Sequence, residues 1–142
     1  MTIVKNSINI HASVEKVFAY VSNPMNTPEW MVNLVEHTNI VGSGVGQHYH
    51  WKYTMIGLPF QGETTVLEYV PNERFVTEST GGLSGSFTFS FAPHESGTKL
   101  DLEVDYTIPV PVLGKLAEKL VLKRNQREAD MSMQNIKERL EV

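Results

Sequence analysis

The chain has 142 residues, which is enough for one domain of ordinary size and leaves no room for a second. Apolar residues make up 41% and charged residues 20%, values that exclude disorder and collagen-like repeats. The net charge of −4 argues against a nucleic-acid partner, and the absence of cysteine excludes disulfides, thiolate metal sites and cysteine nucleophiles.

The first thirty residues predict one strand and two short helices. Residues 2–11 alternate isoleucines with polar neighbours, which indicates a strand and includes no apolar run typical of a signal peptide, so we expect a cytoplasmic protein. Ser13 is a suitable N-cap for a helix over 14–21, where apolar residues recur at i, i+3, i+4 and i+7. A further helical turn is expected with Thr27 as its cap and Pro28 as its first residue.

Residues 34–108 predict six strands separated by turns that contain glycine or proline. Apolar and polar residues alternate clearly in 48–55, 86–91 and 100–108, so one face of the sheet is dry and the other wet. For 62–70 and 73–80 neither face is clearly apolar, and the inward side of these two strands stays unassigned.

A long helix is predicted from about residue 112 to 140. It is the only element large enough to cover the dry face of the sheet. We therefore expect a single α+β domain over 1–142, in which a curved seven-stranded antiparallel sheet surrounds this helix and two short helices follow the first strand. A curved sheet around one helix leaves space between them, because side chains meet at the rims before they fill the middle.

The turns around 55–60, 81–85 and 108–114 are apolar and contain glycine or proline. In an up-and-down sheet these three segments fall at the same end. Because long, exposed apolar loops are costly unless they cover something, we expect this end to be the mouth of a cavity.

Several segments resemble one superfamily: residues 13–21, Asn23-Pro24, residues 28–31, Gly81-Gly82, and the segments 97–100 and 135–141. The chain resembles the helix-grip (START-like, SRPBCC) superfamily, and within it the polyketide cyclase/dehydrase and lipid-transport branch. This resemblance implies the helix-grip fold and a ligand cavity under the long helix. It does not name the ligand, because members bind lipids, hormones, quinones or polyketides.

The candidate ligand-binding residues are those that the predicted register places on the dry face or under the helix. Aromatic rings suit a flat or long apolar ligand, and buried phenols need hydrogen-bond partners. Trp30 has an alternative role as a plug for the open side of the sheet. The candidates are Trp30, Tyr49, Trp51, Tyr53, Met55, Phe87, Phe89, Phe91, Val104, Tyr106, Leu116, Leu120 and Arg124.

Neither a metal nor a cofactor is expected. His48 and His50 have a spacing that can chelate zinc, but they lie on the wet face without an evident third ligand. The carboxylates of the last strand point outward, and the other polar groups that could face inward are typical of a solvated surface. Those groups are Glu63, Glu68, Glu78, Arg124 and Arg127. The catalytic residues, if the protein is an enzyme, are unknown.

The sequence favours a protein that binds or transports a small hydrophobic molecule, such as a lipid, quinone or polyketide. A polyketide cyclase or dehydratase is the alternative, in which a tyrosine or Arg124 steadies an enolate. A module that docks through its apolar loops is the second alternative. Transient membrane contact and a homodimer both stay open. An inward carboxylate or histidine would favour the enzyme, and a filled core would favour docking.

Overall fold

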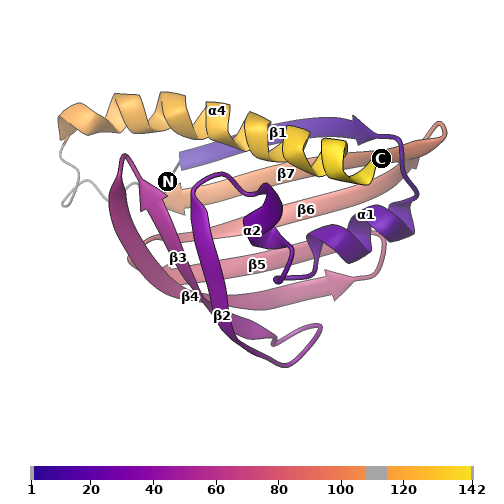
Figure 1. The fold of residues 1–142 in the computed structure, drawn as a ribbon, viewed down its shortest axis with the longest axis horizontal. Helices are drawn as coiled ribbons and strands as arrows, with labels where there is room; N and C mark the ends of the chain where they lie inside the picture. The colour runs from indigo at the N-terminus through magenta and orange to yellow at the C-terminus, as the bar shows by residue number, and fades with distance from the viewer. Residues whose placement is uncertain (1, 108–114, 142) are drawn as a thin grey trace.

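The computed structural model describes residues 2–107 and 115–141, with the side chains of 115–118 excepted. Figure 1 shows a curved sheet with one long helix across its open side. The elements in chain order are β1 (Thr2–Ile10), α1 (Val14–Val21), α2 (Thr27–Trp30), β2 (Leu34–Val41), β3 (His48–Met55), β4 (Leu58–Val70), β5 (Arg74–Gly81), β6 (Ser84–His94), β7 (Gly97–Thr107) and α4 (Lys115–Leu140).

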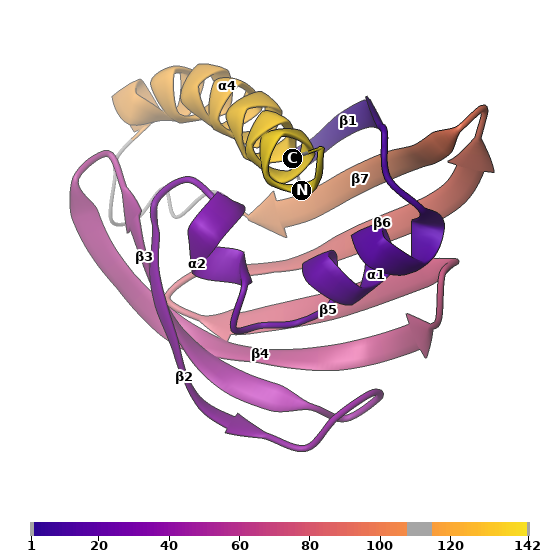
Figure 2. The same ribbon diagram turned by 45° about the vertical axis from the view of Figure 1, so that its right-hand side comes forward.

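All seven strands form one antiparallel sheet in the order β1-β7-β6-β5-β4-β3-β2. Strands β2 to β7 form a meander, and β1 closes the row beside β7. Figure 2 shows how the sheet curves so that α1 and α2 lie on its concave side, while α4 spans the opening above them. The predicted helix-grip fold is confirmed.

The N-terminal helices differ in how they are capped. Ser13 accepts a hydrogen bond from the backbone N–H of Lys16 at 3.3 Å, so it caps α1 as predicted. Thr27 was predicted as the cap of α2 but is its first residue, and the preceding Asn26 makes no side-chain cap bond. The predicted start of the last helix near residue 112 lies outside the described residues.

The structure assigns the inward faces that the sequence left open. In β4 the inward positions include Phe60, Thr64 and Val66, and in β5 they include Phe75 and Thr77. A register shift between Val66 and Glu68 then interrupts the alternation along β4. Inward threonines and this irregularity explain why no apolar period was visible.

The turns at the expected cavity mouth are shorter than predicted. Ile56 and Gly57 form a two-residue hairpin with φ angles of 52° and 73°, and Gly82 and Leu83 join β5 to β6. The third segment, 108–114, lies outside the described residues.

Two apolar clusters hold the sheet, α1, α2 and α4 together. The larger cluster joins α1, the sheet and the second half of α4, and includes Phe18, Phe89 and Ile136. The smaller one lies near the start of α4 and contains Trp51, Met55, Phe60 and Val121. Within the described part of the chain, none of the helices has both the length and the apolar character needed to cross a bilayer.

Candidate ligand cavity

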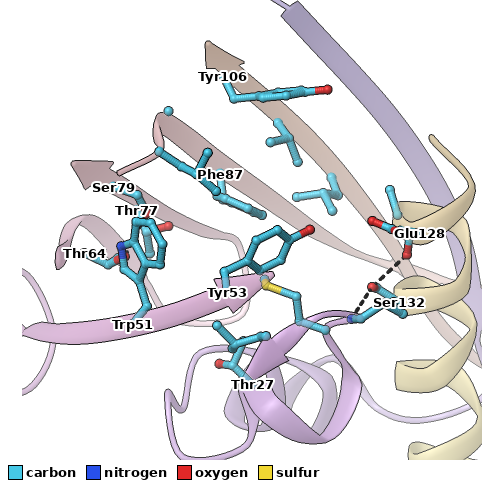
Figure 3. Close-up of a pocket in the computed structure, with 18 of the residues that line it drawn as sticks. Thr27, Trp51, Tyr53, Thr64, Thr77, Ser79, Phe87, Tyr106, Glu128 and Ser132 are labelled. Atoms are coloured by element: carbon cyan, nitrogen blue, oxygen red, sulfur yellow. Dashed lines mark hydrogen bonds between the residues drawn. The ribbon is translucent and has the colours of Figure 1, made fainter. Parts of the chain in front are cut away.

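A cavity of about 180 Å³ lies between the concave face of the sheet, α2 and α4. A single water needs only roughly 10–15 Å³ on the same measure, so the side chains leave room for a molecule much larger than water. Aromatic rings from β3, β6 and β7 form much of the wall, and Figure 3 shows Trp51, Tyr53, Phe87 and Tyr106 around the open space.

The floor of the cavity carries hydroxyl groups from β4 and β5. The Thr64 Oγ1 and Ser79 Oγ atoms lie 2.7 Å apart and hydrogen bond to each other. Thr77 lies one inward position along β5 from Ser79 and also lines the cavity. Figure 3 shows these three side chains grouped near Trp51. The floor therefore forms a polar patch next to the aromatic rings of β3 and β6.

Two indole N–H groups in the wall are buried and find no hydrogen-bond partner among the described residues. They belong to Trp30 and Trp51, whose side chains both line the cavity. The Trp51 ring rests on Gly62, where an added Cβ would come within 2.6 Å of its Cζ2 atom. Buried donors of this kind are rare because an unmade hydrogen bond costs free energy. Both groups could donate to a bound molecule.

The helix side of the cavity is polar, since Asn125, Glu128 and Ser132 of α4 all line it. Asn125 donates from Nδ2 to the Tyr106 hydroxyl at 2.7 Å. Ser132 donates to the backbone oxygen of Glu128 at 2.8 Å and accepts from the Val32 N–H at 3.0 Å, which ties α4 to the segment after α2. Glu128 adds a carboxylate to this side of the cavity.

Burial raises the pKa of the tyrosines around the cavity. Desolvation is the main cause for Tyr49, Tyr53 and Tyr106, and the negative charge of Glu128 adds to it for Tyr53 and Tyr106. The Tyr53 hydroxyl points toward α4 (Figure 3). These phenols therefore stay neutral at physiological pH and can donate hydrogen bonds.

His37 on β2 also lines the cavity. Its ring lies 4.4 Å from the Tyr49 ring, and its Nδ1 atom lies 2.9 Å from the Pro24 carbonyl oxygen. A carbonyl oxygen can only accept, so Nδ1 carries the proton and Nε2 keeps its lone pair. Burial lowers the pKa of His37, against a smaller opposing effect of the Pro24 bond, so the ring is neutral near pH 7.

A family model described as polyketide cyclase / dehydrase and lipid transport matches residues 1–141. The chain belongs to this family. No curated protein matches the chain significantly. The cavity of this structure lies under the long helix, where the resemblance implied one.

Solved structures share the fold at low sequence identity. TTHA0849 from Thermus thermophilus is 20% identical, with 98% of this chain and 97% of that one covered and a TM-score of 0.85. The di-domain ARO/CYC protein StfQ of the steffimycin biosynthetic pathway is 16% identical, with 98% and 50% covered and a TM-score of 0.78. The Aha1 dimer from Colwellia psychrerythraea is 17% identical, with 100% and 98% covered and a TM-score of 0.68. At these identities the likeness concerns the fold alone.

Most of the candidate ligand-binding residues from the sequence line the cavity of this family member. Their side chains come from α2, β3, β6 and β7, as the alternation in those strands predicted. They are Trp30, Tyr49, Trp51, Tyr53, Met55, Phe87, Phe89, Val104 and Tyr106.

The other nominated residues lie elsewhere. Phe91 is buried against Phe18 in the larger apolar cluster, with ring centroids 5.0 Å apart. Leu120 is 50% exposed, and the Arg124 side chain is 48% exposed with its Nε atom 3.9 Å from Glu128 Oε1. The Leu116 side chain lies outside the described residues.

The error in α4 has a geometric cause. The apolar pattern placed Leu120 on the inner face together with Val121, Ala129, Met133, Ile136 and Leu140, and of these only Leu120 faces outward. Beside the cavity the inner face runs through Val121, Asn125, Glu128 and Ser132. These positions are spaced i, i+4, i+7 and i+11, which is a regular helical stripe. Because three of its members are polar, the stripe was not recognised.

The sequence missed other polar lining residues for similar reasons. Thr64, Thr77 and Ser79 occupy inward positions in the strands whose faces were unassigned. His37 lies in β2, for which no face was assigned either. Their period-two spacing from Phe60 and Phe75 was the available signal for the threonines and the serine.

The outward groups lie as expected. His50 pairs with Glu63 on the wet face, with 3.1 Å between Nε2 and Oε1. Glu68, Glu78 and Arg127 are exposed. Among the described residues, no group of three histidine or carboxylate side chains is placed to hold a metal ion.

Proposed function

We propose that the protein binds a small, mainly apolar molecule in the cavity between the sheet and α4. The carrying observation is a hollow of about 180 Å³ whose wall includes the unpartnered indole N–H groups of Trp30 and Trp51. Side chains around an empty space of this size lack packing contacts, which lowers the stability of the fold. The two unbonded indole donors lower it further, and a ligand with an acceptor atom would supply the missing hydrogen bonds.

The shape of the site suits a flat or elongated ligand. Aromatic rings form much of the wall, and a smaller number of polar groups lie on the floor, on α4 and at His37. Such an arrangement is typical of small-molecule sites, in which a few polar groups orient a mainly apolar ligand. Transport of a lipid-like molecule is the corresponding role.

A second function, cyclisation or dehydration of the bound molecule, is favoured by two specific residues. His37 and Glu128 both line the cavity, and an inward histidine or carboxylate is what acid–base catalysis needs. The free Nε2 lone pair of His37 could accept a proton next to a ligand carbonyl. Replacement of His37 by Gln should then abolish turnover of a polyketide-like substrate and leave its binding within about threefold of the wild type.

Docking through the apolar loops is the less favoured function. Leu58 is 42% exposed at the expected mouth, but Leu83 of the next turn lines the cavity. Docking would also require a filled core, whereas the cavity leaves part of this core empty. A homodimer and a cytoplasmic location stay predictions.

Native mass spectrometry of gently purified protein tests the main proposal. We expect a small molecule to remain bound and to be released by organic solvent. If none is found, binding of the neutral fluorescent probe N-phenyl-1-naphthylamine provides the second test. Protein that retains no small molecule and does not bind this probe would contradict the proposal.

The Trp51→Ala variant tests where the ligand lies. Trp51 lines the cavity, whereas its neighbour Lys52 faces outward and pairs with Glu36. Loss of the indole should weaken probe binding by about tenfold or more, and Lys52→Ala should leave it within about twofold. Equal losses in a fluorescence titration of the two variants would place the ligand outside the cavity.

A further inference from the structure

We propose that Glu128 makes the cavity selective for uncharged ligands that carry a hydrogen-bond donor, such as an alcohol or a phenol, against carboxylates and phosphates. This inference rests on the proposed binding function. It assigns the ligand's polar group to the α4 side of the cavity and adds a chemical class to the apolar molecule proposed above.

The charged groups of the cavity wall are of one sign. Among the described lining residues, Glu128 is the only carboxylate, and neither lysine nor arginine is present. His37 is the remaining titratable base, and its buried ring is neutral near pH 7. An anionic ligand would therefore meet a negative charge and no cation inside the cavity.

The Glu128 carboxylate has unused acceptor capacity. Its side chain is only 16% exposed, and it receives no hydrogen bond from the other described residues. Arg124 is its nearest cation, but 3.9 Å from Nε to Oε1 exceeds hydrogen-bond length, and the Arg124 side chain is half exposed to solvent.

The neighbouring donors on α4 are already used within the protein. Asn125 donates to Tyr106, and the Ser132 hydroxyl donates to the backbone oxygen of Glu128 itself. Neither bond involves the carboxylate. The Tyr53 and Tyr106 hydroxyls, which feel the Glu128 charge, make no hydrogen bond to the carboxylate either within the described residues. The carboxylate is thus open to a ligand hydroxyl, and a hydrogen bond from such a group to a carboxylate is stronger than one between neutral groups.

These features act in opposite directions on the two classes of ligand. A hydroxyl gains a charge-assisted hydrogen bond. A ligand carboxylate loses its hydration, gains no cationic partner in the cavity and is repelled by the like charge of Glu128. Acceptor atoms elsewhere on the ligand could take the indole donors of Trp30 and Trp51.

Competition against N-phenyl-1-naphthylamine at pH 7.5 tests the inference with 2-naphthol and 2-naphthoate, which share a ring system and differ in charge. In the wild type we expect 2-naphthol to bind at least about tenfold tighter. The ratio of the two dissociation constants, 2-naphthoate over 2-naphthol, should fall about fivefold or more in Glu128→Gln. It should be unchanged in Glu63→Gln, whose carboxylate lies on the wet face.

Two further measurements isolate the contribution of the Glu128 carboxylate. Glu128→Gln in an Arg124→Gln background should lower the ratio equally, which excludes an effect of the freed arginine. In the wild type, 2-methoxynaphthalene, which lacks the donor, should bind about fivefold or more weakly than 2-naphthol. This last comparison needs no variant and so does not depend on how the variants fold.

The outcomes distinguish the two proposals. Binding of both naphthalene compounds with a ratio that Glu128→Gln leaves unchanged would overturn the selectivity inference and leave the binding function standing. Equal affinity for 2-naphthol and its methyl ether would overturn the inference as well. If neither compound nor the fluorescent probe binds the wild type, the proposed function fails and the inference fails with it.

Discussion

Trp51 rests on a strand position that has no side chain. Gly62 lies opposite it in β4, and an added Cβ there would come within 2.0 Å of the Thr80 oxygen and 2.6 Å of Trp51 Cζ2. The absence of a side chain at Gly62 therefore positions the indole that forms part of the cavity wall. The sequence alone identified Trp51 as inward but carried no sign of what supports it.

Gly62→Ala should lower the free energy of unfolding by about 1–3 kcal/mol, because both neighbours must shift. The tryptophan emission of the variant should also change, since Trp51 moves. Gly44→Ala is the control: an added Cβ meets nothing within 4 Å, and its φ of +68° costs about 1 kcal/mol through the backbone alone. Chemical denaturation followed by tryptophan fluorescence measures both effects. An unchanged native emission spectrum in Gly62→Ala would show that Trp51 does not depend on this contact.

At the scale of elements, α4 has two differently packed halves. Residues 119–127 include one buried side chain, that of Val121. The second half buries Ser132, Met133, Ile136 and Leu140. The middle of the helix, through Asn125, Glu128, Ala129 and Ser132, thus covers the cavity, and the last turns anchor the helix in the larger core cluster.

Backbone amides of 119–127 should exchange with solvent at least about tenfold faster than those of 131–140, because fewer apolar contacts oppose local opening. Bound N-phenyl-1-naphthylamine should slow amide exchange most around residues 125–132, whose side chains line the cavity, and leave exchange in 136–140 nearly unchanged. Hydrogen exchange followed by mass spectrometry measures both segments in one experiment. Equal protection of the two segments without the probe would contradict this division of the helix.

The elements themselves were largely predictable. Period-two alternation in 48–55, 86–91 and 100–108 defined the strands that carry most of the aromatic wall, and Ser13 marked the start of α1. The apolar pattern marked the inward residues Val121, Met133, Ile136 and Leu140 of α4. It could not mark Asn125, Glu128 and Ser132, because these lining residues are polar. A helix that covers a polar part of a cavity does not show the amphipathic pattern of one that covers a core.

At the scale of the whole molecule, stability should depend on pH through His37. Burial lowers its pKa below the ordinary value of 6.5, so the unfolded chain binds the proton more readily than the folded one. The contribution of neutral His37 to the free energy of unfolding is then fully present above about pH 6.5. It is lost as pH falls from there toward the folded pKa, by at most about 1.4 kcal/mol per pH unit.

The His37→Gln variant should lose this part of the pH dependence. Its unfolding free energy, measured by urea denaturation, should fall less steeply than that of the wild type below pH 6.5. His48→Gln is the matched control, because His48 is exposed on the wet face. Parallel pH profiles of wild type and His37→Gln would show that His37 is not held neutral by burial.

The sequence by itself determined the order of the elements, the aromatic face of the sheet and the kind of fold, because these follow from local periodicity and from the size of the last helix. Only the tertiary structure decided which polar groups meet inside. His37, Thr64, Ser79 and Glu128 come from four separate elements. Their meeting depends on how far the sheet curves and how α4 is rotated, and both are set by packing between distant segments rather than by any local pattern.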